Sequence, residues 1–214
     1  WLDKFTIRNL ELLHSANANA KTLIDIIDKT SSPMGSRLMR RWLSLPLKNR
    51  EQIMSRYEIV DFFVNNNEHI SNFQDSIRQV GDLERLISKV SLLRVNPREL
   101  LQVARALDHI ENIKNLCAES NNDALKLYAE QLNVCDSIRQ RIKRTLNPDS
   151  PAVISKGNII NEGVDEQLDN LRTLSRSGKD YLTDIQRREV AATGISSLKI
   201  GYNNVFGYYL EVTN

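Results

Sequence analysis

The chain has 214 residues, with 29 Lys or Arg against 27 Asp or Glu and a net charge of +2. With 41% hydrophobic residues, it is too apolar and too evenly charged for a disordered chain. No apolar run reaches the roughly 20 residues of a membrane-spanning helix, and no signal-peptide pattern follows Trp1. The small net charge is also unlike that of domains that bind nucleic acid over their whole surface.

Metal and disulfide chemistry find little support. Cys117 and Cys135 are too few and too far apart for a disulfide framework or a zinc site, so we expect two thiols in a reducing compartment. His14, His69 and His109 lack neighbouring ligands at metal-binding spacing. We therefore expect no metal site.

Residues 2–13 mix apolar and β-branched side chains without a clear period, which favours a short strand or an extended entry. A helical period then dominates. Ser32 followed by Pro33 is a helix start, because a serine hydroxyl caps the first turn and proline suits its first position. Leu38, Trp42 and Leu45 share one face of the helix that follows, which predicts a buried Trp42.

Helical periods continue to about residue 146. Polar breaks, Gly81 and the pair Asn96–Pro97 separate the segments. Further helices are predicted over residues 49–64, 68–80, 82–93, 97–116 and, as one or two helices, 125–146.

The strongest break in the chain is residues 147–151, which contain two prolines. After it, residues 164–193 hold neither proline nor a turn cluster, which predicts one long helix of about 45 Å. Its apolar positions are so sparse that it needs a partner helix. Alternating side chains then predict a hairpin, with a turn over 203–207 and a return strand over 208–213.

The fold class is therefore mostly α, ending in a small antiparallel hairpin. A lone hairpin is marginal in water, and the pattern stops at Asn214. We therefore expect the chain to be a piece of a larger protein that holds further strands and a partner helix.

No catalytic motif is present. Residues 177–180 contain a Gly-Lys pair, but Asp180 replaces the hydroxyl that a phosphate loop needs, and the stretch is helical. The carboxylates lie near Lys or Arg on helix surfaces, so we predict no catalytic residue.

Basic residues form three clusters, each open to two interpretations. The clusters are Arg37, Arg40 and Arg41; then Arg139, Arg141, Lys143 and Arg144; and finally Arg187 and Arg188, close to Lys199. Each is either a solvated or salt-bridged face or a set of phosphate contacts. The third cluster is the better candidate for phosphate contact, because it lies far along a long arm.

Four runs of residues resemble the MutS mismatch-repair family. They are residues 6–12 (TIRNLEL), 30–43 (TSSPMGSRLMRRWL), 80–86 (VGDLERL) and 193–213, which include TGI and LKIGYNNVFGYYLEVT. They occur in order over nearly the whole chain. The resemblance implies a helical core and lever domain over residues 1–160 and, over 161–214, the beginning of a clamp domain that touches duplex DNA.

The resemblance also implies what other parts of a MutS protein supply. Family members read mismatches through a Phe-x-Glu motif and hydrolyse ATP with Mg²⁺ at a Walker A loop, and neither motif occurs here. We therefore expect this chain to be no enzyme, to need no cofactor itself and to be monomeric, within a cytoplasmic protein that forms a homodimer or heterodimer.

The expected role is nonspecific contact with the duplex backbone, together with transmission of the nucleotide state between ATPase and clamp. Candidate DNA contacts are Lys199, Asn203 and Asn204 on the hairpin and Arg187 and Arg188 nearby. For each, a purely structural role stays open. The alternatives are a helical scaffold that binds proteins by strand addition and a hydrolase with unrecognised carboxylates.

Overall fold

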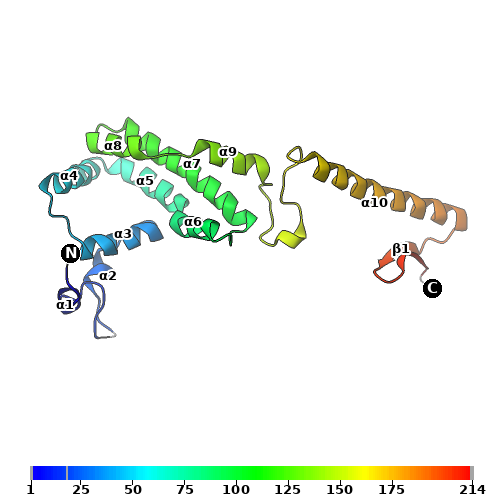
Figure 1. Ribbon diagram of the computed structural model, residues 1–214, viewed down its shortest axis with the longest axis horizontal. Coiled ribbons are helices and arrows are strands. Elements are labelled where there is room, and N and C mark those ends of the chain that lie inside the picture. The colour runs from blue at the N-terminus through cyan, green and yellow to red at the C-terminus, as the bar shows by residue number, and fades with distance from the viewer. Residues whose placement is uncertain (1, 18, 213–214) are drawn as a thin grey trace. The chain divides into compact units, whose positions relative to one another are not determined.

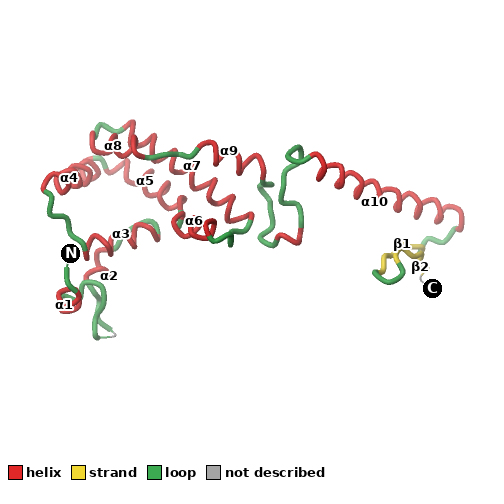
Figure 2. Tube along the Cα trace, in the orientation of Figure 1, coloured by secondary structure: helices red, strands yellow, loops and turns green. Residues whose placement is uncertain are grey.

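The computed structural model describes residues 2–17 and 19–212. It confirms a mostly helical chain with a small antiparallel sheet near its C-terminal end (Figures 1 and 2). The chain forms two compact units, Trp1–Asn161 and Glu162–Asn214. The first holds α1 (Lys4–Asn9), α2 (Leu23–Ile27), α3 (Pro33–Ser44), α4 (Arg50–Asn65), α5 (Asn67–Val80), α6 (Leu83–Ser91), α7 (Pro97–Glu119), α8 (Asp123–Gln131), α9 (Asp136–Thr145) and a 3-10 turn (Ile154–Lys156). The second holds α10 (Glu166–Thr193), β1 (Leu198–Asn203) and β2 (Gly207–Val212).

Side-chain caps start the helices where the sequence places them. The Ser32 hydroxyl accepts a hydrogen bond from the Gly35 amide at 3.1 Å, with Pro33 in the first turn. At the start of α7, Asn96 and Glu99 cap each other's backbone amides at 3.0 and 3.1 Å. These bonds satisfy amides that a helix start leaves without partners.

The expected strand at the N-terminus is wrong, because residues 4–9 form α1. The Asp3 carboxylate accepts hydrogen bonds from the Thr6 amide at 2.9 Å and the Thr6 hydroxyl at 2.7 Å. This local cap nucleates a helical turn and outweighs the β-branched composition, which is a weak signal in so short a segment.

Helix α7 is the centre of the first unit and packs against α5, α6, α8 and α9 (Figure 1). One buried cluster gathers around Leu101 and Leu107 of α7 and takes Ile142 from α9. The other gathers Phe73 of α5, Cys117 of α7 and residues of α8. Nearly all side chains of both clusters come from α4 to α9, so these helices form the stable body of the unit.

The expected burial of Trp42 is also wrong. Its side chain is 40% exposed, Leu38 and Leu45 are exposed to a similar degree, and α3 has no buried residue. The indole ring is covered instead by the Arg56 guanidinium, whose carbon lies 3.5 Å from the ring centroid. A cation over an aromatic face is attracted by the ring's electrons. The helical period of residues 33–44 was therefore predicted correctly, but the group that covers Trp42 is a charged side chain and not an apolar core.

The loop after α9 is folded back onto the end of that helix. The backbone amide of Asn147 donates to the Ile159 carbonyl at 2.7 Å, and the backbone amide of Asn161 donates to the Thr145 carbonyl at 2.9 Å. Ser150, which is 1% exposed, is held within this loop through its hydroxyl. Despite its two prolines, the segment is therefore packed as part of the first unit.

Two of the four basic side chains in the α9 cluster form ion pairs with carboxylates. Arg139 is buried and pairs with Asp108 and Glu111 of α7 and with Asp136 of its own helix. Lys143 pairs with Asp108 at 2.6 Å. The structural interpretation therefore holds for these two cations, which join α9 to α7.

Acid is expected to weaken this junction. The Arg139 guanidinium holds the pKa of Asp136 below its usual value. A carboxyl whose folded-state pKa lies below its unfolded value contributes its stabilisation above about pH 4 and loses it as the pH falls further. Asp136→Asn should therefore lose less stability than wild type between pH 6 and pH 3 in urea unfolding. Glu130→Gln, at an exposed position of α8, is the control, and equal pH responses of Asp136→Asn and wild type would contradict the prediction.

Helix α10 confirms the long helix expected over residues 164–193. It has 28 residues, about 42 Å at 1.5 Å each, and runs from an Asp165 cap to Gly194, whose φ is 73°. Where side chains are described, none on α10 is buried, and Leu171, Leu174 and Tyr181 are 63–68% exposed. No helix in the described part of the chain is long and apolar enough to cross a membrane.

The hairpin pairs β1 with β2 from Leu198 opposite Val212 to Asn203 opposite Gly207. Three residues, 204–206, therefore lie between the strands, within the turn predicted over 203–207. Gly207 follows them with φ of 75°, a left-handed conformation typical of three-residue hairpin loops. Thr213, predicted in the return strand, lies outside the described residues.

Candidate nucleic-acid interface

The hairpin is fixed to α10 at its first residue. Leu198 is 5% exposed, and its carbonyl accepts a hydrogen bond from Gln186 Nε2 at 2.9 Å. The half-buried side chains of α10 around Gln186 recur at helical spacing, namely at Leu182, Ile185, Glu189 and Val190. This face of the helix is therefore the one that supports β1.

The candidate contacts on the hairpin lie at its two ends. Lys199 is exposed next to the anchored Leu198 and stands opposite Glu211 in the register. Asn203 and Asn204 lie at the turn, about 13 Å or more away at 3.3 Å per residue. The three side chains therefore do not form one compact site.

Asn203 has a structural task within the turn. Its Oδ1 accepts a hydrogen bond from the Val205 amide at 2.7 Å. An asparagine that bonds the backbone two residues on stabilises a tight turn. This contact occupies the acceptor side of Asn203, while Asn204 is exposed.

Arg187 and Arg188 are not directed toward the hairpin. They follow Gln186 by one and two residues, which turns them by about 100° and 200° around the helix. Their side chains are 79% and 74% exposed, with Arg187 3.7 Å from Asp184 and Arg188 3.2 Å from Glu189. The five predicted residues thus occupy three separate places: the hairpin root, the turn and the outer faces of α10.

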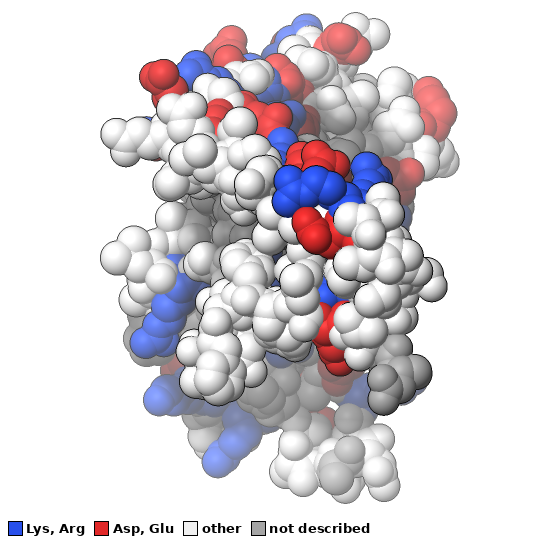
Figure 3. Space-filling view, turned by 90° about the vertical axis from the view of Figure 1, so that its right-hand side faces the viewer, with Lys and Arg blue, Asp and Glu red and all other residues white. Residues whose placement is uncertain are grey.

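Electrostatics do not favour phosphate binding by the second unit as a whole. Residues 162–214 contain six Lys or Arg against eight Asp or Glu, so the positive excess belongs to the first unit. Blue and red side chains lie close together in the upper part and centre of Figure 3, and much of the near surface is white. Any phosphate contact here must therefore come from individual cations and not from a basic field.

The turn of the hairpin carries an exposed apolar surface that was not expected from the sequence. Val205 and Phe206 are 80% and 83% exposed at the end of the hairpin. Beneath them, the rings of Tyr202 and Tyr208 meet at 5.0 Å between centroids and remain largely exposed. The sequence did contain a signal for this surface, because Val205 and Phe206 are adjacent apolar residues inside an otherwise polar turn.

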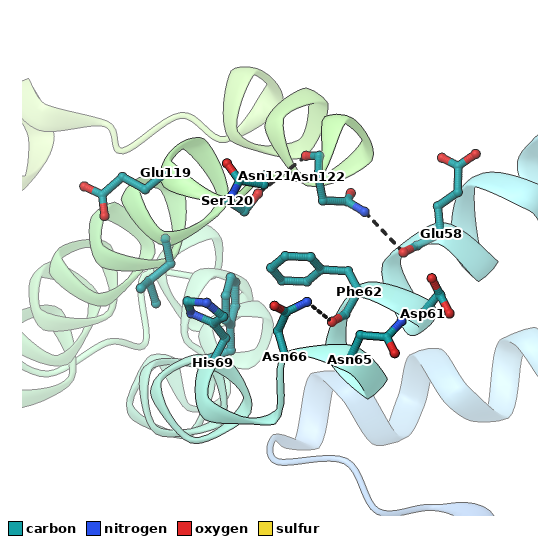
Figure 4. Close-up of a pocket in the computed structure, with 12 residues that line it drawn as sticks. Glu58, Asp61, Phe62, Asn65, Asn66, His69, Glu119, Ser120, Asn121 and Asn122 are labelled. Atoms are coloured by element: carbon teal, nitrogen blue, oxygen red, sulfur yellow. Dashed lines mark hydrogen bonds between the residues drawn. The ribbon is translucent and has the colours of Figure 1, made fainter.

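A polar pocket of about 570 Å³ lies among α4, α5, α7 and α8 (Figure 4). Its Asn66 and Asn122 side chains donate to the Phe62 and Glu58 carbonyls, and His69 stacks on the Phe62 ring at 5.7 Å. Glu58 and Glu119 lie at opposite sides of the opening (Figure 4). The side chains mainly fasten the helix ends, and they bring no nucleophile to a base.

Metal ligation has equally little support in residues 2–17 and 19–212, where no group of three or more His, Cys, Asp or Glu side chains could hold a metal ion.

Comparison with known proteins shows to which family the chain belongs. The family model described as MutS domain III matches residues 5–200. DNA mismatch repair protein MutS of Flavobacterium johnsoniae is 55% identical over 214 residues, covering the whole chain and 25% of the relative. The namesake proteins of Christiangramia forsetii and Bacteroides thetaiotaomicron are 52% and 50% identical, with the same coverage.

The chain therefore belongs to the MutS family of DNA mismatch repair proteins and corresponds to its domain III. It spans about a quarter of the length of the curated relatives it matches.

Proposed function

We propose that this chain is the lever and the beginning of the clamp of a MutS-type protein. Residues 1–160 act as the helical core and lever, and residues 161–214 start the clamp. The observation that carries the proposal is α10, a continuous helix of 28 residues with a hairpin fixed to it by Leu198 and Gln186. Such a helix transmits displacement along its axis because its hydrogen-bonded backbone resists stretching.

The clamp part is proposed to touch the DNA backbone without reading bases. Phosphate contacts position a protein on a duplex and carry no sequence information directly. Lys199 is the strongest of the five candidates, because it is exposed beside the anchored end of the hairpin. Asn203, Asn204, Arg187 and Arg188 are weaker, because they are separate from it and because Asn203 already holds the turn.

Catalysis and mismatch reading are proposed to lie in other parts of the full-length protein. ATP and Mg²⁺ do not fit the Gly-Lys pair of residues 177–180, since these positions lie inside α10 and form no loop. By itself, the chain is proposed to be monomeric and to have no enzyme activity. The full-length protein is proposed to be cytoplasmic, to form a homodimer or heterodimer and to bind mismatched DNA.

Fluorescence anisotropy with matched and mismatched duplexes tests the proposed DNA contact. We expect weak binding, with a Kd on the order of 10⁻⁴ to 10⁻⁶ M, equal for both duplexes and weakened by salt. Lys199→Ala should reduce the slope of log K against log salt by about 1. Lys126→Ala, on α8, is the control and should leave the slope unchanged. Preference for the mismatch, or no binding at low salt, would contradict the proposal.

A protein-binding scaffold is the second candidate. The two-stranded sheet in the described part of the chain has free outer edges, and Val205 and Phe206 are exposed beside them. An added strand pairs with such an edge through main-chain hydrogen bonds. Capture of an extended peptide with an affinity that salt does not change would favour this function over DNA contact.

A further inference from the structure

The N-terminal part of the first unit has its own small core. This part, here called the N-terminal lobe, comprises residues 2–17 and 19–44, with α1, α2 and α3. Ile24 is fully buried, Leu12 is 7% exposed, and their backbones are joined by the bond from the Ile24 amide to the Leu12 carbonyl at 3.0 Å. The Leu2 amide also reaches the Ser44 carbonyl at 3.0 Å. The lobe is thus held together by contacts within itself.

The two hydrophobic clusters of the first unit take nothing from this lobe. Both consist of residues from Ile59 onward. Residues 45–49, which include Pro46, connect the lobe to α4 without helix or strand. Such a short connection between two separately packed parts can act as a hinge, about which one part moves against the other as a body.

A charged contact joins the lobe to the remaining helices. The Arg37 guanidinium of α3 makes two hydrogen bonds to the Asp82 carboxylate, at 2.7 and 3.0 Å. It also bonds Glu84 through Nε at 2.9 Å and through Nη2 at 2.5 Å. Asp82 caps α6 at the Arg85 amide, and the Arg37 guanidinium holds the pKa of Asp82 below its usual value. Figure 1 shows α3 beside α6.

This contact is open to water and to salt. The Arg37 side chain is 48% exposed, Glu84 is 66% exposed and Asp82 is 22% exposed. Exposed ion pairs contribute little each and weaken as salt screens them. A second polar contact of the lobe is the Arg56 guanidinium over the ring of Trp42, a residue that is 40% exposed.

We propose that Arg37, Asp82 and Glu84 form an electrostatic latch that holds the N-terminal lobe against α6, and that opening this latch frees the lobe as a folded body. The hydrophobic clusters around α7 stay intact when the latch opens. Trp42 then leaves Arg56, so its indole ring reports the open state.

Acrylamide quenching of Trp42 fluorescence tests the latch in a Trp1→Phe background. In wild type, raising NaCl from about 0.05 M to about 0.5 M should increase the quenching constant roughly 1.5-fold. Arg37→Ala should show the higher value already at low salt and respond little to added salt. Arg37→Lys should be intermediate, because lysine cannot bond two carboxylates as a fork.

Two controls separate an open latch from a damaged fold. Arg41→Ala removes an exposed cation from the same helix and should behave as wild type. Glu84→Gln leaves the Asp82 cap in place and should shift quenching in the same direction as Arg37→Ala, by less. The proposal is overturned if Arg37→Ala quenches like wild type at both salt concentrations. It is equally overturned if its far-UV helical signal falls together with the change in quenching.

Discussion

Replacing Phe73 by alanine is expected to lower the free energy of unfolding by about 3–5 kcal/mol. Its side chain is 7% exposed and meets the Phe63 ring edge-on at 5.0 Å between centroids. Truncation leaves a cavity between α5, α7 and α8 and removes this aromatic contact. Urea unfolding followed by far-UV circular dichroism measures the loss.

Trp42→Ala is the matched aromatic control for Phe73→Ala. Because the indole is 40% exposed and covered by Arg56, its loss should cost about 1–2 kcal/mol from partial burial and the cation–aromatic contact. Equal costs for the two substitutions would show that the buried cluster around Phe73 is not where the stability lies.

Leu107→Ala is expected to have the second large effect, about 2–5 kcal/mol. Leu107 is 7% exposed in the cluster shared by α7 and α9, and Ile159 and Ile160 pack against that cluster. The substitution should therefore also increase hydrogen exchange in the loop after α9, whose Asn161 backbone amide bonds back to Thr145 of that helix.

Leu127→Ala is the control for Leu107→Ala. Leu127 is 57% exposed on α8, and a substitution at such a position usually changes stability by about 0.5 kcal/mol or less. If both leucine variants unfold at the same urea concentration, the assignment of the core to the α7–α9 interface is wrong.

The candidate site was only partly predictable. The sequence located Lys199, Asn203 and Asn204 on one hairpin, and the register places them there. It could not show that Asn203 turns its oxygen to the Val205 amide, or that Arg187 and Arg188 lie away from the helix face that supports β1. Those facts depend on side-chain direction and on which helix face the hairpin covers, and neither follows from proximity along the chain.

Local chemistry by itself determined most helix boundaries. Ser32–Pro33, Asn96–Pro97, Gly81 and Gly194 start or end helices where the sequence predicted, because capping bonds and backbone preferences act over a few residues. The family could likewise be recognised from ordered runs of residues. Helices α1 and α2 were missed, although α1 depends on a cap at Asp3 and α2 on the bond from the Thr22 amide to the Asp25 carboxylate, which are just as local.

Tertiary structure alone decided which apolar faces are covered and which charges pair. The stripes of α3 and α7 look alike in sequence, yet α7 is packed on several sides and α3 is half exposed. Arg139 is buried among carboxylates, whereas Arg37 lies in an exposed contact with Asp82 and Glu84. Periodicity gives the direction of a face along its own helix, but burial and ion pairing require a partner from a distant segment, and only the packing of the helices supplies it.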